Sequence, residues 1–184
     1  MPKLTQVKET KRGRYALFFD GEFAFSLDED TFAMAGLHTG DELEEWQIHD
    51  LQTKSDTRKA VDKAMDLLAL RDHAAGELYQ KICRSFDPHS AAAAVAKMQE
   101  LNLLDDAGFA RRRAAELLRK RKSRRAILDD LHAKGIDRGA AAEAVEALFA
   151  QSEEDEEENP ELANARALVE RHYAAKLAQG KWQQ

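Results

Sequence analysis

The chain has 184 residues, 43% hydrophobic and 34% charged, and its formal net charge is −6. This length allows one domain or two small ones with a hydrophobic core. The single cysteine, Cys83, excludes an intramolecular disulfide and fits a reducing compartment. No apolar run follows the basic N-terminus or approaches the ~18 residues of a membrane-spanning helix. We therefore expect a cytoplasmic protein without a signal peptide.

The first elements in chain order are predicted to be β-strands. Large apolar residues occupy every second position over 15–19 and again over 23–27, beginning with Tyr15 and Phe23. Asp20-Gly21 lies between the two runs. An Asp-Gly pair between alternating runs indicates a hairpin, because both residues of a type I′ turn adopt positive φ. Leu4–Lys8 is a candidate third strand.

Two short helices should follow and cover this sheet, since a lone hairpin is marginally stable in water. They are expected over 30–35 and 41–52. In the second helix, Leu43, Trp46 and Leu51 are expected to face inward.

From Thr57 onward the spacing of apolar residues predicts helices. Helix starts are marked by Asp87-Pro88, by Asp105 or Asp106, by Ser123 and by Asp137, and Gly135 is the expected left-handed residue after a helix end. The residues expected to be buried are Val61, Ala64, Met65, Leu68, Leu78, Ile82, Val95, Met98, Leu101, Phe109, Ala110, Ala114, Leu117, Leu118, Ile127, Leu128, Leu131, Ala141, Val145 and Leu148.

These helices repeat along the chain. "FDPHSAAAAVAKM" at 86–98 aligns with "IDRGAAAEAVEAL" at 136–148, and a third copy begins at Leu162. A period of this size is typical of stacked units. We predict a mostly α fold, with tandem three-helix repeats stacked in an elongated curved array after a small N-terminal β-hairpin and helix segment. The expected divisions are 1–55 (N-terminal segment), 56–104 (repeat 1), 105–150 (repeat 2), 151–160 (acidic linker) and 161–184 (truncated repeat 3).

Six consecutive acids, Glu153 to Glu158, stand before Pro160. One interpretation is a flexible linker or a frayed helix end, because the like charges repel one another. The other is an acidic mimic that competes for a basic surface of the chain.

Such a basic surface is predicted from the segment Arg111–Leu128, which has nine basic residues and one acid, Glu116. On a helix over 109–122, basic side chains project away from the apolar stripe. Only Glu116 is available to offer them an ion pair, with Lys120, so their mutual repulsion should stay largely uncompensated. Arg113 should lie beside the stripe, and Arg121 should pack its stem inward. The candidate contact residues are Arg111, Arg112, Arg119, Lys120, Lys122, Arg124 and Arg125.

Three interpretations of this basic segment remain open: a nucleic-acid contact, a docking surface for an acidic protein, or a solvated helix face. Aromatic residues on which bases could stack are missing near it. The helices over 88–101 and 138–149 are rich in alanine and nearly free of Arg, Asn and Gln, so sequence-specific reading of DNA is not expected.

Nothing in the sequence predicts an enzyme. The six histidines have no metal-ligand spacing, and no phosphate-binding glycine loop occurs. Cys83 lies in an apolar helix and is interpreted as a packing residue. We expect no catalytic residue, no metal and no cofactor.

The order of motifs resembles the RecX family of bacterial RecA regulators. The most specific segment is "LLDDAGFARRRAAELLRKRKSRRAILDDLHAKGI", and the hairpin "DGEFAFSLDED" is a second anchor. The resemblance covers roughly 3–148. The first repeat departs from the family pattern, because it ends Arg84-Ser85-Phe86 without a glycine, and the third repeat is short.

The resemblance implies a non-enzymatic regulator in DNA repair and recombination, and a monomer is the plain expectation for a stack of repeats that caps itself. It would bind the RecA filament on single-stranded DNA, restrain ATP hydrolysis and strand exchange, and contact DNA directly in addition. Two alternatives are kept beside it. One is a sequence-independent DNA-binding helical module that acts without RecA, and the other is an adaptor whose acidic run docks basic partners.

Overall fold

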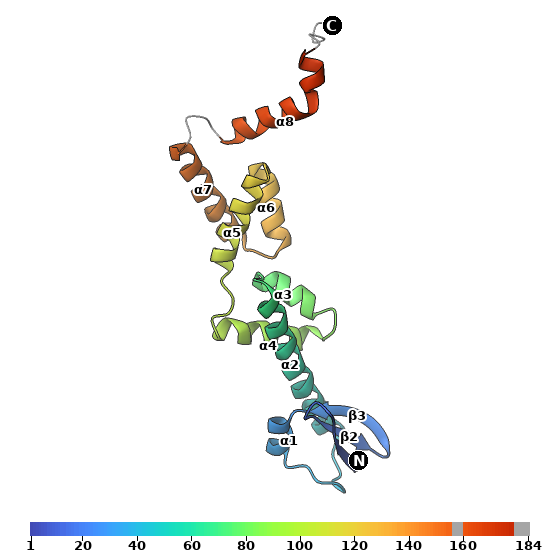
Figure 1. Cartoon of the computed structure of the whole chain (residues 1–184). Helices are drawn as coiled ribbons and strands as arrows, with labels where there is room; N and C mark the ends of the chain where they lie inside the picture. The colour runs from blue at the N-terminus through green and yellow to red at the C-terminus, as the bar shows by residue number, and fades with distance from the viewer. Residues whose placement is uncertain (156–159, 179–184) are drawn as a thin grey trace. The chain divides into compact units, whose positions relative to one another are not determined.

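The computed structural model describes residues 1–155 and 160–178, which form eight helices and a three-stranded sheet (Figure 1). The chain divides into two compact units. Unit 1 comprises Met1–Arg71 and Leu78–Leu103, and unit 2 comprises Asp72–Glu77 and the chain from Leu104 onward. The predicted mostly helical fold with a small N-terminal sheet is confirmed, and the stacking of repeats stays a prediction.

Unit 1 begins with an antiparallel sheet of β1 (Leu4–Glu9), β2 (Tyr15–Phe19) and β3 (Glu22–Leu27), in that order. Asp20 and Gly21 both have positive φ, as the predicted tight turn requires. The candidate third strand is β1, and its Leu4 is fully buried.

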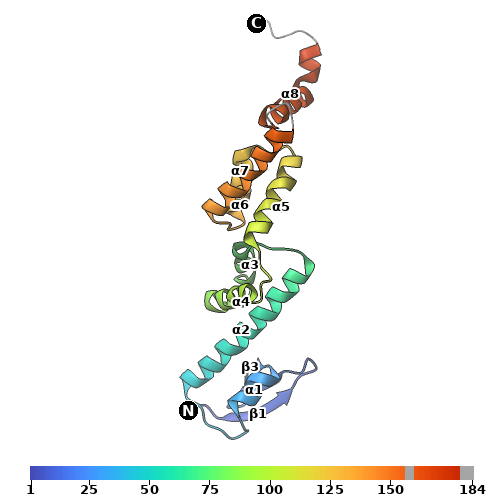
Figure 2. The same cartoon turned by 90° about the vertical axis from the view of Figure 1, so that its left-hand side faces the viewer.

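One face of this sheet, the inner face, carries the hydrophobic core of unit 1. Leu17, Phe19, Phe25 and Leu27 point to this face, and Phe32 of α1 (Glu29–Ala35) stacks on Tyr15 with 4.5 Å between ring centroids. α1 therefore lies against the sheet (Figure 2).

Helix α2 (Glu45–Leu70) runs without a break where two helices were predicted, over 41–52 and from Thr57. Neither glycine nor proline interrupts this stretch, so the local signal for a boundary was weak. Ser55, in the expected gap, is buried and donates a hydrogen bond of 2.6 Å to the carbonyl of Ser26.

Three residues expected to be buried are exposed. Trp46 is 65% exposed, because it lies in the first turn of α2, where its indole N–H donates to Glu44. Met65 is exposed because small residues, Ala60 and Ala64, form the buried stripe of α2. Leu101 is exposed because it follows the last residue of its helix.

Unit 1 is completed by α4 (Pro88–Glu100), which Asp87 caps as predicted by accepting from the backbone N–H groups of His89 and Ser90. Helix α3 (Ala75–Ile82) precedes it; its first residues group with unit 2 and its last with unit 1.

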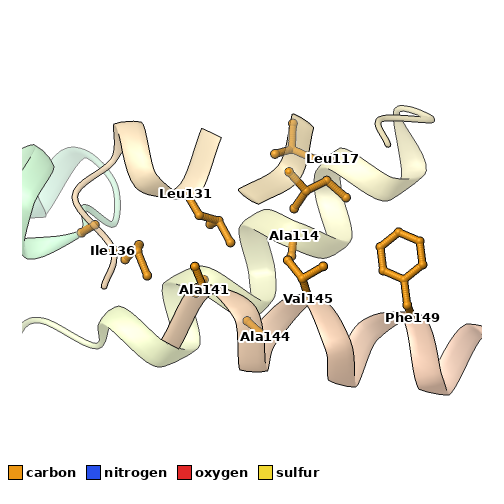
Figure 3. Close-up of a cluster of buried hydrophobic side chains, with 11 residues drawn as sticks. Ala114, Leu117, Leu131, Ile136, Ala141, Ala144, Val145 and Phe149 are labelled. Atoms are coloured by element: carbon orange, nitrogen blue, oxygen red, sulfur yellow. The ribbon is translucent and has the colours of Figure 1, made fainter. Parts of the chain in front are cut away.

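Unit 2 packs α5 (Asp106–Arg119), α6 (Arg124–Ala133) and α7 (Arg138–Asp155) around one core. Small residues of α5 and α7 allow close approach, and larger side chains such as Leu117, Leu131 and Phe149 fill the space between the helices (Figure 3). α8 (Pro160–Ala178) follows, where the third copy was expected to begin.

Helix α7 extends to Asp155, so the first half of the predicted acidic linker is helical. Glu is a good helix former, and no proline occurs between Arg138, where α7 begins, and Pro160. The rest of the acidic run, Glu156 to Glu158, lies outside the described residues. Among the residues described, no helix is long and apolar enough to cross a membrane.

Candidate functional site

The site predicted from the sequence lies on α5, on the start of α6 and on the turn between them. All seven candidate residues are exposed, and together they are called the basic ridge: Arg111, Arg112, Arg119, Lys120, Lys122, Arg124 and Arg125. Their exposure leaves open what they bind.

The fold of α5 explains why these charges gather on one side. Ala110, Ala114 and Leu117 form its buried stripe. At about 100° per residue, Arg112 and Arg119 project opposite that stripe, about 10 Å apart along the helix axis. The remaining cations follow at the C-terminal end of the helix.

A tight turn brings the start of α6 to this end of α5. Lys120 closes α5, Arg121 adopts a positive φ of 57°, and Ser123 caps α6 by accepting from the backbone N–H of Ala126. The expectation that Arg121 packs inward is wrong, because its left-handed conformation in this turn leaves the side chain exposed. Lys122, Arg124 and Arg125 thus extend the basic surface that begins on α5.

Three residues of the ridge have partners within unit 2. Arg112 donates to Asp72 at 2.9 Å, Lys120 pairs with Glu116 as predicted, and the guanidinium of Arg124 lies 4.8 Å from the centre of the Phe149 ring. These side chains are exposed, so each ion pair stabilises the fold by about 1 kcal/mol or less. Such pairs can open to admit another anion.

The other four residues of the ridge, Arg111, Arg119, Lys122 and Arg125, form no ion pair with any residue that the structure describes. An anionic partner would relieve their mutual repulsion.

Arg113 differs from its neighbours because it is locked into the fold. Its guanidinium makes two hydrogen bonds of 2.8 Å to Asp130 of α6 and a third to Glu116, and about a quarter of each side chain of the Arg113–Asp130 pair is exposed. The hydrogen bonds from Arg113 lower the pKa of Asp130, and the same pair raises the pKa of Arg113. The expected place of Arg113 beside the core is confirmed, and the arginine serves the fold.

The expectation that only Glu116 could relieve the basic charge is wrong. Asp130 and Asp72 also pair with arginines of α5, although they lie 17 and 40 residues away in the sequence. The run "LDDLH" offered a weak signal for Asp130, because helices joined by a short turn pack together. No local pattern indicated Asp72.

The segment Asp72–Glu77 is held in unit 2 by polar contacts. Glu77 accepts from Lys134 at 2.7 Å and lies 2.9 Å from the ring of buried His73, and the backbone N–H of Ala75 donates to Asp106. Gly76 lies so close to Gly135 that a Cβ on it would come within 2.7 Å of the Gly135 Cα. These contacts hold the end of α6 in place, and they were not predicted.

This geometry concentrates exposed positive charge along the basic ridge. No cluster of His, Cys, Asp or Glu among the described residues could hold a metal ion. Cys83 is half-buried in unit 1. The arrangement can attract an extended anionic partner.

Comparison with known proteins identifies relatives. No protein-family model matches the chain. A protein named Regulatory protein RecX from Caldanaerobacter subterraneus is 26% identical, over 82% of this chain and 77% of its own. One of the same name from Lactobacillus gasseri is 30% identical, over 97% and 65%. The chain belongs to the RecX family.

Solved RecX structures share its fold. A crystal structure of regulatory protein RecX superposes with a TM-score of 0.65 and 20% identity, over 97% of this chain and 85% of that chain. The chain spans 51% to 77% of the length of the curated RecX relatives that it matches. These relatives are named regulatory proteins.

Proposed function

We propose that this chain regulates the RecA recombinase by binding the RecA filament on single-stranded DNA and inhibiting its ATP hydrolysis and strand exchange. The observation that carries the proposal is the basic ridge, where Arg111, Arg119, Lys122 and Arg125 are exposed without an ionic partner among the described residues. The chain acts as a monomer in the cytoplasm, where the filament assembles.

Membership of the RecX family supports this assignment, because the relatives are named regulatory proteins. The physical chemistry also favours a polyanionic partner. A filament offers repeated negative charge, from the DNA backbone and from acidic protein surface. A ridge of closely spaced cations gains most from a partner of this kind, because it releases several counterions at once.

The test is the DNA-dependent ATPase of RecA, titrated with the wild-type chain and with the variant Arg119→Glu, Lys122→Glu, Arg125→Glu. These positions have no ion pair to lose among the described residues, whereas Arg124 also contacts Phe149 and is therefore left unchanged. Wild type should suppress hydrolysis at or below equimolar concentration. The variant should require about a hundred-fold more protein, because three attractive contacts become repulsive.

A matched control reverses three exposed cations of unit 1 that likewise form no ion pair with a described residue, with Lys3→Glu, Lys63→Glu and Arg84→Glu. It changes the net charge equally and should inhibit like wild type. Absence of inhibition by wild type across the titration would overturn the proposal. If both variants lost inhibition equally, the effect would depend on net charge, and the basic ridge would not be the binding site.

A DNA-binding module that acts without RecA is the alternative, which the same four cations of the ridge also favour. It predicts that the chain binds DNA alone with a steep dependence on salt concentration. It also predicts that excess DNA abolishes any effect of the chain on the RecA ATPase.

A further inference from the structure

One serine stands among the cations at the C-terminal end of the basic ridge. The stretch Arg119–Arg125 reads "RKRKSRR", so six of its seven residues are basic and Ser123 is the remaining one. Every residue of this stretch is exposed. Among the serines whose side chains the structure describes, only Ser85 is exposed as well, and the acid Asp87 follows it closely. Ser123 is therefore the exposed serine with the more basic surroundings.

The hydroxyl of Ser123 is accessible and weakly held. It lies at the end of the turn that joins α5 to α6, and it caps α6 by accepting from the backbone N–H of Ala126 at 3.3 Å. Hydrogen bonds of this kind are usually about 3.0 Å long. The hydroxyl donates its own proton to no acceptor among the described residues. An enzyme that reacts with this oxygen would have to displace one long hydrogen bond.

A phosphate on this hydroxyl would lie among groups that bind anions. It would carry nearly two negative charges at about pH 7 and three acceptor oxygens. The side chains of Lys122 and Arg125 flank the serine in the sequence and form no ion pair with a described residue. The backbone N–H groups in the first turn of α6 have no acceptor within the helix and add the positive end of its dipole. Phosphate and fold would therefore stabilise each other here.

The acids of α5 and α6 that are nearest to Ser123 in the sequence oppose such a phosphate only weakly. Glu116 is paired with Lys120 and Arg113, and Asp130 is held by two hydrogen bonds from Arg113. Asp129 follows Ser123 by six positions, which is about 9 Å along the axis of α6. The repulsion that a phosphoserine meets beside free carboxylates is therefore small at this position.

We infer that Ser123 is a phosphorylation site, at which a protein serine kinase that recognises basic segments lowers the affinity of the basic ridge for its partner. The hydroxyl oxygen attacks the γ-phosphorus of ATP, and the bond from that phosphorus to the β–γ bridging oxygen breaks. ADP leaves, and the hydroxyl proton passes to a base of the kinase. The inference rests on the proposed function and adds its regulation.

Charge complementarity favours this class of kinase. Kinases choose substrates partly by the pattern of charge around the reacting hydroxyl. Basic residues occupy the four positions before Ser123 and the two positions after it. Such a segment fits a substrate groove lined by acids, whereas Ser85, with Asp87 nearby, fits it less well.

The phosphate would act by occupying cations that the ridge otherwise offers to its partner. Lys122 and Arg125 are two of the four ridge residues without an ion pair to a described residue, and both would pair with the phosphate. Arg111 and Arg119 would remain for a polyanion. Fewer counterions are then released on binding, so the affinity falls. Because negative charge at the start of α6 favours the helix, the ridge is neutralised without unfolding of unit 2.

The first test asks whether the site is modified. The full chain is incubated with ATP and the catalytic subunit of cyclic-AMP-dependent protein kinase, which prefers basic segments, and mass spectrometry maps the phosphate. We expect phosphate at Ser123 in wild type, none there in Ser123→Ala, and none at Ser85. The same mapping is applied to the chain purified from its own cells before and after DNA damage. Absence of phosphate at Ser123 in either experiment would overturn the inference.

The second test compares two chains of equal net charge, one phosphorylated at Ser123 and one at Ser85, with phosphoserine incorporated during translation. In the RecA ATPase titration, the chain phosphorylated at Ser123 should require about ten-fold more protein than wild type, because two cations are withdrawn from the ridge. The chain phosphorylated at Ser85 should inhibit like wild type. On a heparin column, without RecA, the first chain should elute at lower salt than the second.

Thermal unfolding followed by circular dichroism separates neutralisation of the ridge from damage to the fold. Phosphorylation at Ser123 should leave Tm unchanged or raise it, and a lowered Tm would contradict the proposed mechanism. Equal elution and equal inhibition by the two phosphorylated chains would overturn the inference. If wild type does not inhibit RecA while heparin still separates the two chains, the proposed function fails and control of the ridge by Ser123 stands.

Discussion

The two sides of α5 carry the same residue type in different states. Toward α6, Arg113 is held by two short hydrogen bonds to Asp130. On the opposite side, Arg119 is exposed and forms no ion pair with any residue of the described chain. Arg119 follows Arg113 by six positions in the same helix. The difference teaches that a cation stabilises the fold when it forms an ion pair and remains available to a partner when it does not. Its charge alone does not decide between the two.

The largest expected effect comes from the paired side. Arg113→Ala should lower the free energy of unfolding by about 2 kcal/mol, because Asp130 then loses its partner in a site that is only about a quarter exposed. The matched control Arg119→Ala should change it by about 0.5 kcal/mol or less. Urea unfolding of both variants measures the difference. Equal stabilities would erase the distinction between the two sides.

A second, smaller effect tests whether the contacts of Asp72–Glu77 hold unit 2 in the same way. Glu77→Gln should cost about 1–2 kcal/mol, because it removes the charge that faces Lys134 in a mostly buried position. Glu143→Gln, an exposed change on α7, is the control and should be neutral. Thermal unfolding of the two variants compares them. A neutral Glu77→Gln would show that these contacts are replaceable.

The smallest effect is a pH dependence. Hydrogen bonds from Arg113 lower the pKa of Asp130 below its ordinary 3.8, and hydrogen bonds from Lys120 and Arg113 lower that of Glu116. The resulting stability is fully present above the ordinary values and is lost as the pH falls through the folded-state values. Wild type should therefore lose more stability than Arg113→Ala on acidification from about pH 5 to pH 2. Circular dichroism measures the stability of both proteins as the pH falls. If both lost stability equally, the ion pairs of Arg113 would not be the origin of the pH dependence.

Local sequence patterns determined most elements of the fold. The Asp20-Gly21 turn, the caps at Asp87 and Ser123 and the left-handed Gly135 all form as predicted. Each depends on a few neighbouring residues, whose hydrogen bonds and φ preferences are the same in most proteins. The exposure of Arg112 and Arg119 in the basic ridge followed for the same reason, because helical periodicity places them opposite the stripe that contains Ala114.

Only the tertiary structure decided the partners of these charges and the continuity of α2. Asp72 reaches Arg112 across 40 residues, and Glu77 reaches Lys134 across 57. The hydroxyl of Ser55 meets the Ser26 carbonyl across 29 residues, in the stretch where two separate helices were expected. Such contacts depend on how elements pack, which local propensity does not encode. The sequence thus determined which side chains are cationic and exposed, and packing decided which of them stay unpaired.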